Sequence, residues 1–209
     1  MRKLLLCVLT GSILIGNVFA DGVDSLQRFM QANKTLSAKF TQTVFGHKRN
    51  QTSTGSMEIS RPNKFRWVYD NQGNNAGQLI VCDGKTIYIV DNELQQVTQK
   101  KLGQTLDKSP AMLLAGSSDI KVNYIVANKP EVNGVDWVSL KPKNSNDNNG
   151  FQVVDMGFDN VKHQLVQMNF TDNFGGKSQI NFTNVKDSVK FKTNEFDYKA
   201  PKGYDTIDG

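Results

Sequence analysis

The chain has 209 residues, of which 25 are basic and 20 are acidic, giving a formal net charge of +5 at pH 7. This length suits one domain with a substantial hydrophobic core. The charge is mild, the basic residues are scattered and no nucleic-acid-binding motif appears, so the composition argues against a nucleic-acid partner.

Residues 1–20 predict a cleaved signal peptide. Arg2 and Lys3 form a positive start, residues 4–18 form an apolar run, and the segment ends in Val-Phe-Ala, which supplies small residues before the cleavage site. The run is short and interrupted by polar residues, and no second hydrophobic span follows, so it does not predict a membrane anchor. We therefore expect residues 21–209 to form a single exported, soluble domain.

The cysteines exclude an intramolecular disulfide in the mature chain. Cys7 falls early in the apolar run, with most of the hydrophobic segment still to come, so it cannot be the lipid-bearing first residue of a lipoprotein. Signal cleavage leaves Cys82 without a second cysteine. Because residues 78–82 are largely apolar, we expect Cys82 to be a buried small hydrophobe rather than a reactive thiol.

Residues 21–33 predict an amphipathic helix. Val23, Leu26 and Met30 recur at the spacing of one helix face, and Asp21 or Asp24 near the start suits the positive end of the helix dipole. A helix of this length is marginal alone in water, so it must lie on another element.

From Leu36 the apolar period changes to two, which predicts β-strands. Residues that favour turns, such as Asp83-Gly84, separate the strands, and residues 70–77 predict a polar loop. The tail, 191–209, is either a last strand or a loop wrapped across the sheet edge. Together with two helices, this pattern predicts a mainly β protein built on a curved antiparallel sheet or open barrel. The predicted strands cover residues 36–44, 54–59, 64–69, 78–82, 86–90, 95–102, 121–126, 136–141, 151–158, 164–171 and 179–185.

A second, short helix is predicted at 110–115. Ser109 before Pro110 is a helix-start signal, and Gly116 suits the C-terminal cap. This helix is apolar almost all round, so it must be buried or must cover an apolar surface. Its place between strands suggests a plug or a lid.

The stretch 60–69 organises the chain. Pro62 keeps Arg61 out of the helical region, and Phe65, Trp67 and Tyr69 then share one face of a strand. Two interpretations are open: an ordinary core strand, or an aromatic binding face with a cation at its mouth. Likewise, the two helices and Phe40 would either enclose an apolar cavity or complete a packed core.

No catalytic or metal site is predicted. His47 and His163 are far apart in the sequence, and zinc motifs, phosphate-binding glycine motifs and a Gly-x-Ser-x-Gly elbow do not occur. Asp83 and Asp91 flank a predicted hairpin, where acidic residues normally serve the turns. We therefore expect a protein that is not an enzyme and needs no cofactor.

Several motifs occur in a fixed order along the mature chain. They are 36–42 (LSAKFTQ), 61–67 (RPNKFRW), 83–85 (DGK), 109–114 (SPAMLL) and 196–203 (FDYKAPKG). Each alone is weak, but as an ordered set they resemble the LolA family of outer-membrane lipoprotein carriers.

The resemblance implies an incomplete antiparallel β-barrel, or half-barrel, with a helical lid over an apolar cavity. It implies a monomeric periplasmic carrier that shields the acyl chains of lipoproteins. Cargo would come from an inner-membrane ATP-driven (ABC transporter) release complex and go to an outer-membrane receptor.

The resemblance also implies roles for residues. Arg61 would latch the lid by bonding the backbone carbonyls of Met30, Leu114 and Ala115 in the empty, closed form. Ala111 stands where a family member has an aromatic residue, which implies a reshaped lid contact. The acyl-binding residues implied are Leu26, Met30, Phe40, Phe65, Trp67, Met112 and Leu113.

Three alternatives remain. The outer-membrane receptor of the same fold is lipid-anchored, whereas this chain has no usable cysteine at its cleavage site. A periplasmic lipid- or glycolipid-binding or sensing protein on the same half-barrel would differ by an extra domain or a lipidation signal. A periplasmic enzyme would need perturbed titratable groups in the cavity.

Overall fold

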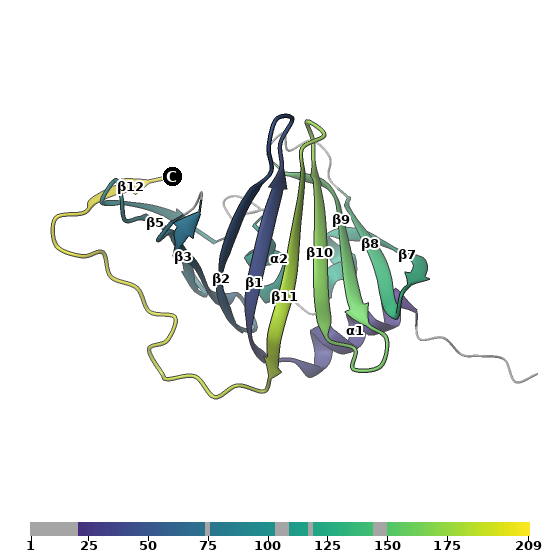
Figure 1. The fold of residues 1–209 in the computed structure, drawn as a ribbon. Helices are drawn as coiled ribbons and strands as arrows, with labels where there is room; N and C mark the ends of the chain where they lie inside the picture. The colour runs from purple at the N-terminus through teal and green to yellow at the C-terminus, as the bar shows by residue number, and fades with distance from the viewer. Residues whose placement is uncertain (1–20, 74–75, 103–108, 117–118, 144–149) are drawn as a thin grey trace, which may run out of the picture.

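The computed structural model describes residues 21–73, 76–102, 109–116, 119–143 and 150–209 (Figure 1). The predicted signal peptide, 1–20, lies outside the described residues. Among the helices that are described, none has the length and hydropathy needed to cross a membrane.

One twelve-stranded sheet forms most of the described part of the chain, in the order β12-β6-β5-β4-β3-β2-β1-β11-β10-β9-β8-β7. The edge strands β7 and β12 lie at opposite ends of this order, so the curved sheet stays open. This confirms the predicted half-barrel. The strands are β1 Thr35–Phe45, β2 Gln51–Ser60, β3 Lys64–Gly73, β4 Leu79–Asp83, β5 Thr86–Asp91, β6 Gln96–Lys101, β7 Tyr124–Val132, β8 Val135–Pro142, β9 Phe151–Asp159, β10 Leu165–Asp172, β11 Lys177–Asp187 and β12 Asp205–Asp208.

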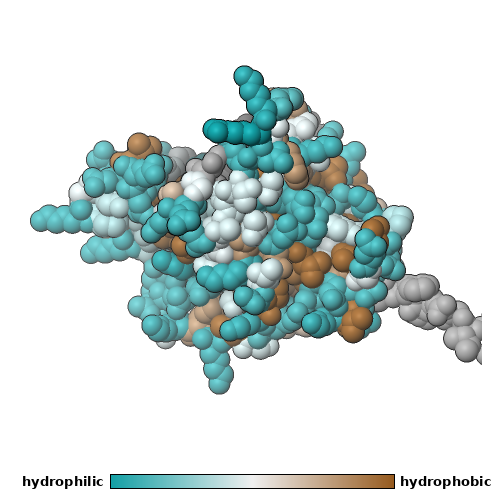
Figure 2. All heavy atoms as spheres, viewed as in Figure 1, coloured by the Kyte–Doolittle hydropathy of each residue, from teal (hydrophilic) through white to brown (hydrophobic). Residues whose placement is uncertain are grey.

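The period-two pattern gives the sheet one apolar face. On β3, Phe65, Trp67 and Tyr69 are buried, whereas Lys64, which precedes them, and Arg66, between Phe65 and Trp67, are more exposed. Figure 2 shows the opposite, outer face as mostly hydrophilic with scattered apolar patches. The three aromatic side chains of β3 therefore point to the inner side.

Both predicted helices are present, and α2 has the predicted caps, Ser109 at its start and Gly116 at its end. Helix α1, Gly22–Ala32, begins where the Asp21 side chain accepts from the Asp24 amide, and it packs on β7, β8 and β9. Helix α2, Pro110–Ala115, begins where the Ser109 hydroxyl accepts from the Met112 amide, and it packs on β2 and β3. The two helices together are called the lid below.

Two predicted boundaries are wrong. Strand β3 continues to Gly73 through the predicted loop 70–77, because pairing with β2 extends the strand beyond its apolar part. The predicted strand 121–126 begins instead with a 3-10 turn, Ile120–Val122, and β7 runs from Tyr124 to Val132. Pro130 is tolerated in β7 because this strand is at the sheet edge.

The C-terminal tail contains both a last strand and a loop that wraps across the sheet edge, the two structures predicted as alternatives. After β11 it crosses to the far edge of the sheet, where β12 pairs in parallel with β6. On the way, Tyr198, Ala200 and Tyr204 pack against a second apolar cluster of Leu79, Val81, Val90 and Val97. The tail thus covers an apolar part of the outer face and the edge of β6, which would otherwise be open to pairing with another chain.

The tail also brings Glu195 against Glu58 on β2. Burial, followed by the nearby Glu195 carboxylate, raises the pKa of Glu58 above its ordinary 4.5. The folded state then binds more protons than the unfolded state, so protonation of Glu58 stabilises the fold. This contribution to the free energy of unfolding is complete below pH 4.5 and is lost as the pH rises through the raised pKa of the folded state.

We therefore expect Glu58→Gln to raise the melting temperature at neutral pH, with a smaller effect below pH 4.5. Thermal unfolding across this pH range measures it. Glu93→Gln, in the exposed turn between β5 and β6, is the control. Equal shifts for both variants would contradict the pairing of Glu58 with Glu195.

Candidate functional site

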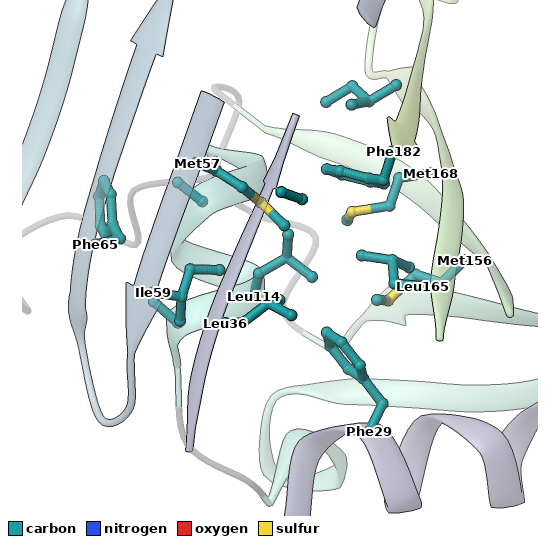
Figure 3. Close-up of a cluster of buried hydrophobic side chains, with 14 of the residues drawn as sticks. Phe29, Leu36, Met57, Ile59, Phe65, Leu114, Met156, Leu165, Met168 and Phe182 are labelled. Atoms are coloured by element: carbon teal, nitrogen blue, oxygen red, sulfur yellow. The ribbon is translucent and has the colours of Figure 1, made fainter. Parts of the chain in front are cut away.

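The concave side of the sheet is filled with apolar side chains from the sheet and both lid helices (Figure 3). Phe29 from α1 and Leu114 from α2 point toward side chains of the strands. Among the described residues, this inner cluster occupies the space in which we expected a cavity. The structure therefore shows a closed form, and the packed-core alternative describes its interior. The labelled members are Phe29, Leu36, Met57, Ile59, Phe65, Leu114, Met156, Leu165, Met168 and Phe182.

A pocket of about 180 Å³ lies at the rim of this interior, beside α1. Leu26, Ile120 and Val126 form its apolar part, and Gln27 and Lys121 are among its polar lining residues. Because Leu26 belongs to both the pocket and the inner cluster, the pocket adjoins the closed interior.

Methionine is concentrated in this interior. Met30, Met57, Met156 and Met168 belong to the inner cluster, and Met112 packs against it. These are all the methionines in the described residues. Methionine side chains are unbranched and polarisable and fit irregular spaces, so the cluster can repack around a guest more easily than one built from branched residues.

Aromatic side chains line one side of the cluster, and we call Phe40, Trp67, Tyr69 and Phe182 the aromatic wall. The Phe40 ring lies 4.4 Å from Trp67 and 5.3 Å from Tyr69, and Trp67 meets Phe182 edge-on at 6.4 Å. Gly55 on β2 makes room for this arrangement, since a Cβ there would approach Phe40 Cζ to 2.5 Å.

Arg61 lies in the turn between β2 and β3, at the C-terminal end of α1. Its Nη1 donates to the carbonyl of Asn33, its Nη2 lies 3.5 Å from the sulfur of Met30, and its Cζ lies 4.8 Å from the centre of the Phe29 ring. The guanidinium therefore contacts the last turn of α1 and the residue that follows it.

These contacts differ from the implied latch, in which Arg61 bonds the carbonyls of Met30, Leu114 and Ala115. Met30 is contacted through its sulfur, and the carbonyl of Ala115 accepts from the backbone amide of Asn63 at 2.7 Å. Leu114 is fully buried in the inner cluster. The turn 61–63 thus contacts both lid helices, α1 through the Arg61 side chain and α2 through the Asn63 amide.

Burial lowers the pKa of Arg61 to about 10, and the Asp187 carboxylate partly opposes this. Arg61 therefore stays charged at neutral pH, at a desolvation cost on the order of 3 kcal/mol. A hydrogen bond from a charged donor, about 1.5–3 kcal/mol, and a cation–π contact, about 0.5–2 kcal/mol, offset that cost. These contacts therefore compensate for much of the cost of burying the Arg61 charge beside α1.

The N-terminal half of α1 is fixed by polar contacts. The Ser25 hydroxyl donates to Asp136 Oδ2 at 2.9 Å and lies 3.2 Å from His163 Nδ1, and Asn128 Oδ1 accepts from the Val23 amide. Serine stands between the acid and the histidine, whereas a nucleophilic triad needs histidine in the middle. Gly22 lies so close to β8 that a Cβ would meet the carbonyl of Trp137 at 2.1 Å.

Removing this anchor should destabilise the helix from its N-terminal half. Ser25→Ala leaves the buried Asp136 carboxyl group without that donor, and we expect a loss of about 1–3 kcal/mol of unfolding free energy. Chemical denaturation measures the loss, and hydrogen exchange of the α1 amides locates it. Ser56→Ala, on the outer side of β2, is the control; an equal loss in both variants would argue against an anchor.

The structure places the other residues implied by the resemblance in or next to the interior. Leu26, Met30, Phe40, Phe65 and Trp67 belong to the inner cluster. Met112 and Leu113 are partly buried and pack against it. The sequence reasoning missed Met57, Met156, Met168 and Phe182, although each occupies an inward position in its strand.

An open antiparallel half-barrel with two short helices over its apolar concave side defines the class of fold. Within that class, the chain belongs to the LolA family. Residues 31–199 match the family described as "Outer membrane lipoprotein carrier protein LolA".

Relatives with the same description cover most of the chain. The outer-membrane lipoprotein carrier protein of Chromobacterium violaceum is 38% identical over 190 residues, which cover 91% of this chain and 89% of the relative. The protein of the same name from Neisseria meningitidis is 32% identical over 204 residues, covering 98% and 94%.

Solved structures support the fold alone, because their sequences are distant. A LolA superfamily protein from Nitrosomonas europaea has a TM-score of 0.50 at 9% identity, covering 85% of this chain and 96% of that one. A putative outer membrane lipoprotein-sorting protein domain from Vibrio parahaemolyticus has a TM-score of 0.51 at 11% identity, covering 84% and 94%.

Proposed function

We propose that this protein is a periplasmic carrier that shields the acyl chains of outer-membrane lipoproteins. The observation that carries the proposal is the lidded apolar interior in a chain whose relatives are named lipoprotein carriers. Acyl chains would replace the contacts between the lid and the strands, and they would pack against the methionine-rich cluster.

The energetics require such a shield. Each acyl CH₂ exposed to water costs about 0.8 kcal/mol, so an anchor with two or three chains costs on the order of tens of kcal/mol to release unprotected. The sequence carries no phosphate-binding glycine motif. Loading would therefore depend on an energised partner, for which an ATP-driven inner-membrane release complex is suited.

Delivery must then run downhill to an outer-membrane receptor. Closing the lid over an empty interior restores the buried contacts of Phe29 and Leu114 and the contacts of Arg61. These contacts favour the empty form and so offset part of the cost of losing cargo. In this proposal Arg61 is the residue that sets the balance between the open and closed lid.

Protein purified from the periplasm under mild conditions should carry acylated polypeptides. Native mass spectrometry and lipid extraction detect them, with an outer-face variant such as Arg66→Leu as a control for non-specific adhesion. Recovery of free lipids or glycolipids with no acylated polypeptide would favour the lipid-sensing alternative and contradict the carrier role.

A further inference from the structure

The closed interior contains a hydrogen-bond donor without an acceptor. Trp67 is 2% exposed, and within the described part of the chain its Nε1 has no hydrogen-bond partner. Buried indole N–H groups usually find a partner, because leaving a donor unpaired costs about 1–3 kcal/mol. An isolated donor of this kind calls for an explanation other than packing.

The ring that carries this donor is held by its neighbours. Phe40 stacks on it at 4.4 Å, and Phe182 meets it edge-on. Two residues along β3, the hydroxyl of Tyr69 donates to Gln42 Oε1 at 2.8 Å. Within the aromatic wall, the Tyr69 hydroxyl therefore has an acceptor, whereas the Trp67 N–H has none among the described residues.

An acyl chain itself offers no acceptor. The first polar atom that it brings into the interior is the carbonyl oxygen of the ester or amide that joins it to its head group. We propose that Trp67 Nε1 donates a hydrogen bond to this carbonyl, so that the carrier recognises the acyl linkage as well as the hydrocarbon. The inference rests on the proposed function and makes Trp67 a specificity-determining residue.

The proposal predicts a preference between two guests of equal hydrocarbon content. A site with a buried donor placed for a carbonyl oxygen disfavours an analogue that lacks the carbonyl, because only the ether oxygen at another position is then left to accept. Dioctanoylglycerol carries two ester carbonyls, whereas dioctylglycerol, its ether analogue, has none. The wild-type protein should bind the ester about tenfold more tightly than the ether.

The test is calorimetric titration of the mature protein with both probes. Trp67→Phe keeps an aromatic ring but removes the N–H, and it should bind both probes with nearly equal affinity. The ratio of the two affinities isolates the hydrogen bond, since any space left by the smaller ring affects both probes alike. Trp137→Phe, on β8, should keep the ester preference.

The outcomes separate this inference from the function on which it rests. If the wild-type protein binds the ester and the ether equally tightly, the hydrogen bond is overturned and acyl binding stands; this comparison needs no variant. An ester preference that survives in Trp67→Phe has the same meaning. Failure of the wild type to bind either probe overturns acyl binding itself. A second comparison distinguishes the two possible sources of the carbonyl, a lipoprotein anchor and a phospholipid. If the protein binds a diacylglyceryl-cysteine peptide more tightly than a phosphatidylcholine with the same chains, the ligand is a lipoprotein anchor. The reverse order contradicts this.

Discussion

Arg61→Leu should load with lipoprotein but retain it, slowing transfer to the receptor by about tenfold or more. In the closed form the guanidinium donates to Asn33 and lies over Phe29, and these contacts help to compensate for the loss of cargo. Leucine would leave the Asn33 carbonyl without this donor. It would also add an apolar contact to a bound acyl chain, where arginine would place a charge.

Transfer is measured as movement of a labelled lipoprotein from loaded carrier to receptor, and retention as labelled cargo that stays with the carrier. Arg66→Leu is the matched control, because Arg66 lies on the same hairpin but on the opposite face of β3 from the buried aromatic residues. Transfer by Arg61→Leu at the wild-type rate would remove Arg61 from the release step.

Leu114→Ala should destabilise the empty protein by about 2–5 kcal/mol, the usual cost of removing a large buried side chain. Leu114 is fully buried between α2 and the strands, and its contacts depend on a closed lid. In the proposed mechanism cargo opens the lid, so the loaded form should be affected less. The variant should therefore combine a lower melting temperature when empty with tighter retention of cargo.

Thermal unfolding of empty and loaded protein measures both effects. Leu113→Ala is the control, since Leu113 is the next residue of the same helix but only partly buried. If Leu114→Ala destabilises the empty and loaded forms equally, Leu114 is an ordinary core residue and α2 does not act as a lid.

Much of the fold could be predicted because its signals are local. The alternation of Phe65, Trp67 and Tyr69 fixes the inner face of β3, and Ser109 with Pro110 fixes the start of α2. The extension of β3 to Gly73 could not be predicted in this way, because pairing with a neighbouring strand, not apolar periodicity, maintains it.

The site was less predictable because its contacts are tertiary. Ser25 meets Asp136, 111 residues away, and His163, 138 residues away, and no local pattern joins them. The acceptor that Arg61 reaches depends on where the chain leaves α1, so Asn33 could not be distinguished from Met30 in the sequence. Met57, Met156 and Met168 look like ordinary inward strand positions until the lid is seen to close over them.

The methionine-rich interior carries a chemical liability. Oxidation turns a flexible thioether into a polar sulfoxide, which is poorly suited to an apolar cluster. With the lid shut, Met57, Met156 and Met168 are shielded by the surrounding side chains. In the proposed carrier cycle, each opening would expose these sulfur atoms to the oxidants of an extracytoplasmic compartment. The molecules that deliver cargo most often would therefore be the first to be inactivated by oxidation.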